Sequence, residues 1–472
     1  MAEEVWMLQT KKADFKQIGA RFRIDPVTAR IIRNRGIEGE AAIDRYLNGT
    51  LDDLYDPMLL KDMERAVSIL CEAVDTGKKI RIVGDYDIDG VCSTYILLQA
   101  FERLGSDVDF EIPDRIKDGY GINESIIEQA HADGVEVILT CDNGISAFHQ
   151  VELAKKYGMT VVITDHHEVP LDGEKEKIPP ADAVIDPKQA DCPYPFPEIC
   201  GAVVAYKLVQ VLYARRGVPQ MEWLDLLEFA AIATVGDVMK LQDENRILVK
   251  YGLKKMAQTK NLGLRRLAEK NNLDLGAITA YHIGFVIGPC LNAGGRLKTA
   301  KEALALLRAQ SEEEAERLAE ELKELNDTRK DMTEQGTEAA KLQVESWYQK
   351  DKVLVVFLPE CHESLAGIIA GRLREYYQKP AIVLTRGEEA VKGSGRSIDE
   401  YHMFKKLTEV SDLLLKFGGH PLAAGLSLEE KNIDEFRRRL NENAGLTEED
   451  FKAKVWIDVP MPVGYVTERL VR

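Results

Sequence analysis

Three carboxylates stand at alternate positions in the segment DYDIDG, residues 85–90, directly after the apolar run IRIVG. Alternation places Asp85, Asp87 and Asp89 on one side of the extended chain, and Gly90 permits a sharp exit from the strand. Negative charge gathered in this way opposes folding through self-repulsion unless a positive partner neutralises it. Divalent cations prefer oxygen ligands of this kind, so the segment predicts a metal-binding site.

Other acidic residues also follow strand-like segments. Asp142 follows VILTC, the triplet Asp165-His166-His167 follows TVVIT, and Asp237 lies in ATVGDVM. Because ligand sites of parallel sheets lie at the carboxyl ends of the strands, we expect Asp142 and the triplet, which follow apolar strands, to converge with DYDIDG. Carboxylates and imidazole without cysteine favour Mn²⁺ or Mg²⁺ over Zn²⁺, and five or more such ligands exceed what one ion needs. The pattern therefore predicts a bridged pair of ions.

Each motif taken alone also has a purely structural interpretation. A single Asp at a strand end is most often a turn residue or a helix cap, and a single His166 is more often a hydrogen-bonded core histidine than a ligand. DxDxDG also opens the EF-hand calcium loop, but that loop needs a Glu at its twelfth position, where this chain has Ile96. Four acidic segments in the same strand-to-helix context favour the metal site.

The elements that must position these residues alternate between strand and helix. The β-branched runs KIRIVG, VILTCD and TVVITD alternate with helical stretches at 94–104 and 146–157, followed by a more helical region over 201–300. This rhythm predicts an α/β domain with a parallel sheet. Residues 311–345 are charged, with leucines at helical spacing, which predicts a long connecting helix.

A second, smaller α/β domain is expected after this helix. VLVVFLP and AIVLT are strand-like, a helix is expected over 365–377, and VKGSGRS is glycine-rich and expected to form a loop. The predicted organisation is an N-terminal helical cap (1–60), an α/β domain with the predicted two-metal site (61–305), a connecting helix (306–348), a second α/β domain (349–445) and a tail or the start of a further module (446–472).

Composition limits the class of protein. The 472 residues carry a formal net charge of −17, which disfavours a protein that coats nucleic acid non-specifically but leaves room for a local metal-assisted site. The seven cysteines include no C-x-x-C pair, so neither a disulfide framework nor a thiolate zinc site is expected. The N-terminal segment MAEEVWMLQTKK has no apolar core, and no membrane span is visible. A cytoplasmic location is therefore predicted.

The Asp165-His166-His167 triplet and the motifs around it resemble the DHH phosphoesterase superfamily. PDRIKDGYG (113–121), GPCLNAGGRLKTA (288–300) and KFGGHPLAAGLSL (416–428) resemble motifs of the bacterial RecJ single-strand-specific exonucleases. The resemblance covers roughly residues 60–445 and implies a parallel-sheet DHH domain joined by a long helix to a smaller α/β DHH-associated domain.

The resemblance also implies roles for individual residues. Asp87 would hold a first ion and Asp89 a second, Asp142 would bridge them, and His166 and Asp237 would complete the second ion's ligands. Asp85, Asp165 and His167 would orient ligands or face the phosphate. The catalytic set would be Asp87, Asp89, Asp142, His166, His167 and Asp237.

Substrate contacts are implied in both domains. Ser394, Arg396 and Arg115 would hold a 5′-phosphate, Tyr120 would stack on a base, and Arg296 would face the backbone near the scissile bond. The GSGRS loop and the segment Gly418-Gly419-His420 would lie opposite the metal ions. Without the resemblance, these residues would be taken for surface arginines and an ordinary turn.

The function implied is 5′→3′ hydrolysis of single-stranded DNA by two Mn²⁺ or Mg²⁺ ions, in DNA repair and recombination. A single-strand-binding protein and a helicase are candidate partners, and no membrane partner is expected. The alternatives are a nano-RNase or nucleotide phosphatase of the same superfamily, and a non-catalytic DNA-binding scaffold. Bacterial RecJ proteins usually continue into an OB-type module, of which VWIDVPMPVGYVTERLVR resembles only the beginning, so a truncated chain is expected.

Overall fold

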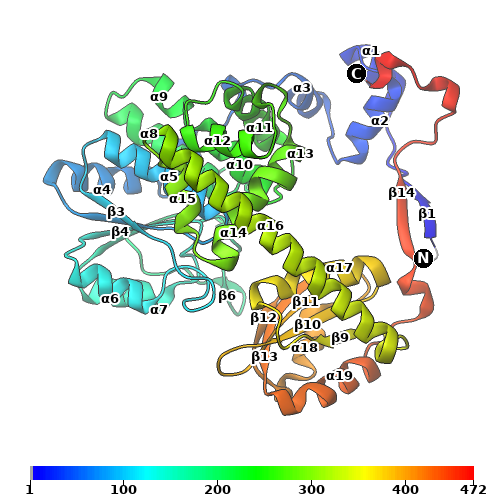
Figure 1. Cartoon of the computed structure of the whole chain (residues 1–472). Helices are drawn as coiled ribbons and strands as arrows, with labels where there is room; N and C mark the ends of the chain where they lie inside the picture. Colours follow the sequence, from blue (N-terminus) through cyan, green and yellow to red (C-terminus); the bar gives the residue numbers. More distant parts are fainter. Residues whose placement is uncertain (1–3, 472) are drawn as a thin grey trace. The chain divides into compact units, whose positions relative to one another are not determined.

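A computed structural model describes residues 4–471 of the chain (Figure 1). Contacts divide the chain into two compact units. The first unit comprises residues 39–326, and the second joins the residues up to Glu38 with those from Asp327 onward. Among the described residues, no helix is both long enough and apolar enough to cross a membrane.

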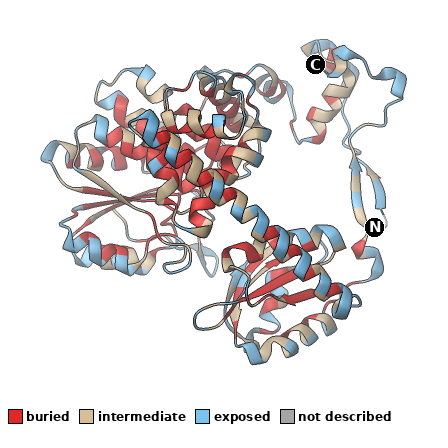
Figure 2. Ribbon diagram, in the orientation of Figure 1, coloured by how far each residue is buried: buried red, intermediate tan, exposed pale blue. Residues whose placement is uncertain are grey.

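The first unit is built around a five-stranded sheet in which every strand is parallel to its neighbours. The strand order is β3 (Val108–Glu111), β2 (Ile80–Val83), β4 (Val137–Cys141), β5 (Thr160–Thr164) and β8 (Ala183–Ile185). The three central strands are buried almost throughout because helices cover both faces of the sheet (Figure 2). The predicted parallel α/β domain is confirmed.

Alternate side chains of the strands enter two different cores. Ile82 and Leu139 belong to one core, and Val83 and Ile138 belong to the other. The first core is closed by α4 (Met63–Thr76), α5 (Ile88–Arg103), α8 (Gly201–Arg215) and α10 (Leu227–Gly236). The second core is closed by α6 (Glu124–Ala132) and α7 (Phe148–Lys156). The strands are therefore held from both sides, which fixes the positions of their carboxyl ends.

Helix α5 begins earlier than the stretch 94–104 that the sequence predicted. It begins at Ile88 because Asp87 caps it, with Oδ1 accepting hydrogen bonds from the backbone N–H groups of Asp89 and Gly90. Further helices complete the unit: α11 (Asp243–Met256), α12 (Leu262–Lys270), α14 (Gly288–Leu297) and α15 (Lys301–Leu307).

The predicted connecting helix is α16 (Glu312–Gln343), a single helix of 32 residues. Leu318 and Leu322 in its first half are buried in a core of the first unit. Ala340 near its end is buried in a core of the second unit. The apolar residues at the two ends of α16 thus pack into two different cores and do not form the continuous apolar seam of a coiled coil.

The second unit contains a mixed five-stranded sheet. Its order is β12 (Leu414–Gly419), β13 (Ala423–Leu428), β11 (Val391–Arg396), β10 (Ala381–Arg386) and β9 (Leu354–Phe357). Only β9 and β10 are parallel. Helix α17 (Ala366–Tyr377) packs on one face and α19 (Ile433–Glu442) on the other. This is the smaller α/β domain that the sequence predicted.

The expectation that VKGSGRS forms a loop is wrong, because residues 391–396 are the central strand β11. Its glycines are needed for close packing. A Cβ at Gly393 would lie 2.6 Å from the Leu384 side chain, and one at Gly395 would lie 3.1 Å from Met403. Small residues let neighbouring side chains cross the strand here, so glycine content did not signal flexibility.

The N-terminal residues contain a strand that the sequence did not predict. Strand β1 (Glu4–Leu8) pairs in parallel with β14 (Ala453–Ile457) in the second unit. Helices α1 (Phe15–Phe22) and α2 (Pro26–Asn34) also belong to that unit, whereas α3 (Glu40–Asn48) belongs to the first. Contacts therefore divide the segment 1–60 between the two units, and the proposed domain boundaries remain a prediction.

Candidate metal centre

The carboxyl ends of β2, β4 and β5 place the predicted residues at one edge of the sheet. Val83 pairs with Thr140, and Cys141 pairs with Thr164, so the residues that follow these strands leave the sheet side by side. These are the DYDIDG segment, Asp142 and the Asp165-His166-His167 triplet. Asp237, the C-terminal cap of α10, reaches the same place from the helical layer.

Two groups of possible ligands lie next to each other. Asp85, Asp87 and Asp142 form one group, within which the candidate ligand atoms lie no more than 4.8 Å apart. The second group meets the same limit and consists of Asp89, His166 and Asp237. Both groups are large enough to hold a divalent cation, and the side chains are hard or borderline donors that suit Mn²⁺ and Mg²⁺.

Asp142 links the two groups, because its carboxylate also forms a third group with His166 and His167 that meets the same distance limit. Its Oδ1 atom is 3.1 Å from Nε2 of His166, and its carboxylate also belongs to the group of Asp85 and Asp87. This buried oxygen has no hydrogen-bond partner. A buried carboxylate oxygen without a donor is costly, and a cation would supply the missing positive charge. The donor set therefore fits two adjacent ions that share one carboxylate.

The backbone of Asp142 is held in an unusual conformation. Its φ angle is 60°, in the left-handed region that L-residues rarely adopt. Its N–H donates to the Thr164 carbonyl at 3.1 Å, and its own carbonyl accepts from the Tyr120 hydroxyl at 2.8 Å. These bonds turn the side chain toward the two groups of ligands.

Asp89 is fixed by the N-terminus of α8. Its two carboxylate oxygens accept hydrogen bonds of 2.7 Å from the backbone N–H groups of Gly201 and Ala202. Unpaired N–H groups and the helix dipole favour an anion at this position. Gly201 is packed so closely that a Cβ there would lie 2.7 Å from the Cβ of Asp142.

Asp165 organises the triplet without facing the group of Asp85 and Asp87. Oδ1 accepts from the N–H of His166 at 2.7 Å and bonds to Nδ1 of His167 at 2.7 Å, and Oδ2 accepts from the N–H of Ile145 at 2.9 Å. The Tyr120 hydroxyl lies 3.0 Å from the same ring nitrogen of His167. Asp165 thus orients both histidines, as a residue behind a ligand should.

The clustered carboxylates oppose one another's ionisation. Burial, and then the neighbouring carboxylates, raise the pKa of four side chains: Asp85, Asp87, Asp142 and Asp237. The pKa of Asp237 reaches about 8. Burial lowers the pKa of His166. Burial also acts to lower the pKa of His167, but the hydrogen bond to Asp165 and the charges of Asp165, Asp89 and Asp237 together outweigh it and raise that pKa to about 9.

Arg115, Tyr120 and Arg296 surround the DYDIDG segment. The Arg115 guanidinium lies 4.6 Å from the ring centroid of Tyr86, and Tyr120 packs edge-on to the same ring. Burial raises the pKa of Tyr86, and the charges of Arg115 and Arg296 oppose that rise. The three residues therefore lie near Asp85 and Asp87, and their roles in substrate binding stay a prediction.

Ser394 and Arg396 lie beside a helix N-terminus in the second unit. A Cβ at Gly367, in the first turn of α17, would lie 2.9 Å from both Ser394 Oγ and Arg396 Nη2. Arg396 Nη1 donates to Ser394 Oγ at 3.2 Å. Backbone N–H groups at a helix N-terminus, with a hydroxyl and a guanidinium beside them, suit a phosphate.

Gly418 and Gly419 end strand β12 of the same sheet, and His420 follows them. Gly418 pairs with Gly425, which pairs on its other side with Ser394. The backbone N–H of His420 donates to the Ala423 carbonyl at 2.7 Å. Strand pairing thus gathers these residues around Ser394.

Two buried residues near the edge of the sheet were missed by sequence reasoning. Asp186 follows β8 in the segment AVID, is fully buried, and has one carboxylate oxygen without a hydrogen-bond partner. Burial, and then the charge of Asp165, raise its pKa to about 7. Asn143 donates to the carbonyls of Val83 and Cys141 and so ties β2 to β4. The signal for Asp186 was available, because AVID repeats the pattern of an apolar strand that ends in Asp.

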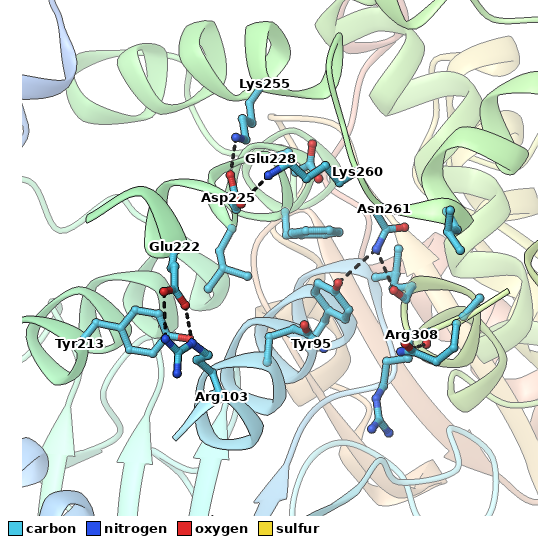
Figure 3. Close-up of a pocket in the computed structure, with 17 residues that line it drawn as sticks. Tyr95, Arg103, Tyr213, Glu222, Asp225, Glu228, Lys255, Lys260, Asn261 and Arg308 are labelled. Atoms are coloured by element: carbon cyan, nitrogen blue, oxygen red, sulfur yellow. Dashed lines mark hydrogen bonds and ion pairs between the residues drawn. The ribbon is translucent and has the colours of Figure 1, made fainter. Parts of the chain in front are cut away.

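A separate pocket of about 400 Å³ lies within the first unit (Figure 3). It is lined by side chains of α5 and α10, among them Tyr95 and Glu228, and by neighbouring segments. Its cations are bound to acids: Arg103 to Glu222, and Lys255 and Lys260 to Asp225. The pocket contains none of the predicted site residues, so it is distinct from the metal centre.

Family models match both halves of the chain. The DHH family N-terminal domain matches residues 79–234, and the DHHA1 domain matches residues 350–445. The chain is 35% identical over 462 residues to the single-stranded-DNA-specific exonuclease RecJ of Haemophilus influenzae, which covers 93% of this chain and 79% of that protein. The chain belongs to the RecJ family.

A second RecJ, from Bacillus subtilis, is 38% identical over 467 residues, which cover 98% of this chain and 58% of that protein. The crystal structure of RecJ in complex with Mn²⁺ from Thermus thermophilus matches with a TM-score of 0.83 at 29% identity, over 98% of this chain and 65% of that one. The chain therefore spans somewhat less than two thirds of these two RecJ proteins. The expected resemblance to the family is confirmed, together with the DHH and DHH-associated domains.

Proposed function

We propose that this RecJ-family chain is a 5′→3′ exonuclease that hydrolyses phosphodiester bonds of single-stranded DNA with two divalent metal ions. The observation that carries the proposal is the position of Asp142, whose carboxylate belongs both to the group of Asp85 and Asp87 and to a group with His166 and His167. Bound Mn²⁺ or Mg²⁺ would generate a nucleophilic hydroxide and stabilise the charge that develops on the phosphate.

The side chains divide the work of holding these ions. We propose Asp87, with Asp85 beside it, for the first ion. We propose Asp89, His166 and Asp237 for the second ion, and Asp142 for both. Asp85 was expected to lie behind the ligands, but its carboxylate is close enough to Asp87 and Asp142 to serve as a ligand itself.

Other residues would act on the substrate directly. His167 is partly exposed and is held by Asp165, so its ring can donate a hydrogen bond to a phosphate oxygen. Arg115 and Arg296 would hold the strand close to the carboxylates through backbone phosphates. Tyr120 would contact the terminal nucleotide, with its ring fixed by the hydrogen bond from its hydroxyl to Asp142.

Direction would come from the end of the strand. Ser394, Arg396 and the first turn of α17 would bind the terminal 5′-phosphate, with Gly418, Gly419 and His420 around it. A fixed terminal phosphate sets which phosphodiester bond is cut, and repeated cutting from that end runs 5′→3′. A DNA substrate implies action in the cytoplasm during repair and recombination, and the expected single-strand-binding protein and helicase remain predicted partners.

The alternatives are less well supported. A non-catalytic scaffold would not require a full set of metal-facing carboxylates, and all of them are present here. A nano-RNase or nucleotide phosphatase would prefer very short substrates, whereas the identity to RecJ proteins extends over almost the whole chain.

Digestion of labelled strands tests the proposal. The chain with Mn²⁺ is expected to degrade a long 5′-phosphorylated single strand to mononucleotides, to spare a blunt duplex, and to release label from the 5′ end first. Release from the 3′ end first, or turnover of dinucleotides only, would contradict it.

A further inference from the structure

Two aromatic side chains are exposed side by side on the first unit. Tyr281 belongs to the short helix α13 (Ala280–His282), and Phe285 belongs to the π-helical turn η4 (Ile283–Ile287) that continues it. Their ring centroids are 4.8 Å apart with an angle of 28° between the rings. Tyr281 is 64% exposed and Phe285 is 68% exposed. The pair therefore offers a large aromatic surface to solvent. Exposure of apolar surface to water is unfavourable in free energy, so an exposed aromatic pair of this size often marks a binding site.

The segment that carries the pair is firmly held. Ile283 and Ile287, between and after the two rings, are fully buried. The N–H of Thr279 donates to Nδ1 of His282 at 3.0 Å, which caps the first turn. Wide π-helical turns of this kind occur frequently at functional sites. The rings are thus presented by a rigid element, so that little conformational entropy would be lost when a ligand stacks on them.

The pair lies next to the helix that carries Asp237. Turn η4 packs against α10, and a Cβ at Gly284 would lie 3.7 Å from a methyl group of Val235, two residues before Asp237. The residue after Asp237 is Val238, which is 86% exposed and has a φ of 59°, an uncommon conformation for a β-branched residue.

The same segment continues to the other side of the metal centre. Helix α14 follows η4 directly, and a Cβ at Gly295 would lie 2.3 Å from the carbonyl oxygen of Tyr86 in DYDIDG. Arg296, proposed to contact the DNA backbone, is the next residue. Residues 281–296 therefore run from the exposed rings to the metal-facing carboxylates along one continuous stretch of chain.

We propose that Tyr281 and Phe285 form a stacking platform for bases of a single strand that enters the metal centre. This inference rests on the proposed function and names a further contact of the same substrate. Each base of a single strand has a free π face, whatever its identity, and stacks favourably on aromatic side chains. The bases of a duplex are stacked on each other and cannot offer that face. The platform would thus add affinity without sequence preference and would favour single strands.

Binding of matched strands tests the platform. Fluorescence anisotropy in metal-free, low-salt buffer would compare a 5′-phosphorylated oligothymidine with a strand of equal length in which abasic tetrahydrofuran residues replace the nucleosides downstream of the first. Tyr281→Ala combined with Phe285→Ala is expected to weaken binding of the oligothymidine by about tenfold or more. The abasic strand should bind the variant and the wild type equally, because neither complex contains a stacked base there.

Two further variants separate stacking from folding. Tyr157 forms a comparable stacked pair with His131 on the α6–α7 side of the sheet, with centroids 4.2 Å apart, so Tyr157→Ala is the matched control and should bind both strands like the wild type. Phe285→Tyr keeps an aromatic face and should bind oligothymidine like the wild type, whereas Phe285→Leu keeps only apolar bulk and should bind it more weakly.

The outcomes distinguish the platform from the nuclease assignment. If the double variant loses the same factor on both strands, or loses nothing on oligothymidine, the platform is wrong even where the wild type digests DNA. If the wild type digests no DNA but the base-dependent loss of binding is found, the platform stands and the nuclease assignment fails.

Discussion

Nε2 of His166 lies 3.1 Å from Oδ1 of Asp142, an oxygen that is buried and accepts no hydrogen bond. One cation could be bound by both atoms, because neighbouring ligand atoms around one ion lie about 3 Å apart. This relationship makes Asp142 the residue on which the two-metal assignment depends most directly.

Replacing Asp142 should therefore abolish turnover. Asp142→Asn keeps the size of the side chain but removes the charge shared by the two ligand groups. Loss of one stabiliser of transition-state charge typically lowers kcat by about 10²–10³, and weakening two ion sites together should cost more. Initial rates on a 5′-labelled single strand with Mn²⁺ measure the effect. Asp172→Asn, in the exposed strand β6 (Leu171–Asp172), is the control and should turn over substrate like the wild type. Turnover of Asp142→Asn within tenfold of the wild type would contradict the two-metal assignment.

Mn²⁺ should stabilise the folded chain against unfolding. The unfolded chain has no preformed site, so free Mn²⁺ at about 100 times its Kd should add about 2.7 kcal/mol to the free energy of unfolding. The melting temperature measured with and without Mn²⁺ reports this gain. The variant Asp89→Ala with His166→Ala should show little shift, and an equal response from it and from wild type would place the bound Mn²⁺ elsewhere.

The metal-free protein should lose stability as the pH rises from about 5 to 8. The folded pKa of Asp237 is raised to about 8 from 3.8, and those of Asp85 and Asp142 are also raised, so the folded state binds more protons than the unfolded state in this range. Stability that is present at low pH is therefore lost as these groups ionise. The lowered pKa of His166 makes the free energy of unfolding increase with pH, but this single group is outweighed by the several carboxyl groups with raised pKa values.

Urea unfolding at several pH values, with EDTA and then with saturating Mn²⁺, measures this dependence. Mn²⁺ displaces the protons, so its apparent affinity should rise with pH and its presence should reduce or reverse the loss of stability. If the free energy of unfolding in EDTA increased steadily from pH 5 to 8, the raised pKa values of the clustered carboxyl groups would be wrong.

Arg396→Ala should weaken recognition of the 5′-phosphate. Removing a charge-assisted hydrogen bond should cost about 1.5–3 kcal/mol of binding to a 5′-phosphorylated strand. The loss should shrink on a 5′-hydroxyl strand, because the partner of the arginine is missing there. Arg386→Ala, on the neighbouring strand β10 of the same sheet, is the matched control. Equal losses on both strands would make Arg396 a general backbone contact.

Gly201→Ala should damage the metal centre although it changes no ligand. The added methyl group would stand 2.7 Å from the Cβ of Asp142 and 2.9 Å from its Oδ1, so the carboxylate must move. We expect weaker Mn²⁺ binding by calorimetry and a lower melting temperature. Gly371→Ala in α17 is the control, since a Cβ there has no neighbour within 4 Å and alanine favours helix. Unchanged Mn²⁺ affinity in Gly201→Ala would argue against Asp142 as a ligand.

The convergence of the acidic side chains could be predicted because the geometry of a parallel sheet is simple. Each apolar run ends in an acidic residue, and parallel register brings those ends to one edge. Asp186 obeys the same rule and was overlooked. The hydrogen bonds from Gly201 and Ala202 to Asp89 could not be predicted, because they depend on where a distant helix begins.

The error over VKGSGRS has a different cause. Glycine is common in loops because it is flexible, but it is also needed in strands that other side chains cross at short distance. The sequence alone does not distinguish these uses. Exposure is equally hidden from sequence, which is why nothing set Tyr281 and Phe285 apart from the rest of the helical region.

The metal-facing residues are spread along the chain from Asp85 to Asp237, and the last of them comes from a helix that follows the whole sheet. A nascent chain can therefore not assemble the complete site until α10 has been synthesised and has packed against α5. Binding of the complete pair of ions would therefore be a late event in the synthesis of the protein, and a fragment released before α10 is made would lack one of the proposed ligands.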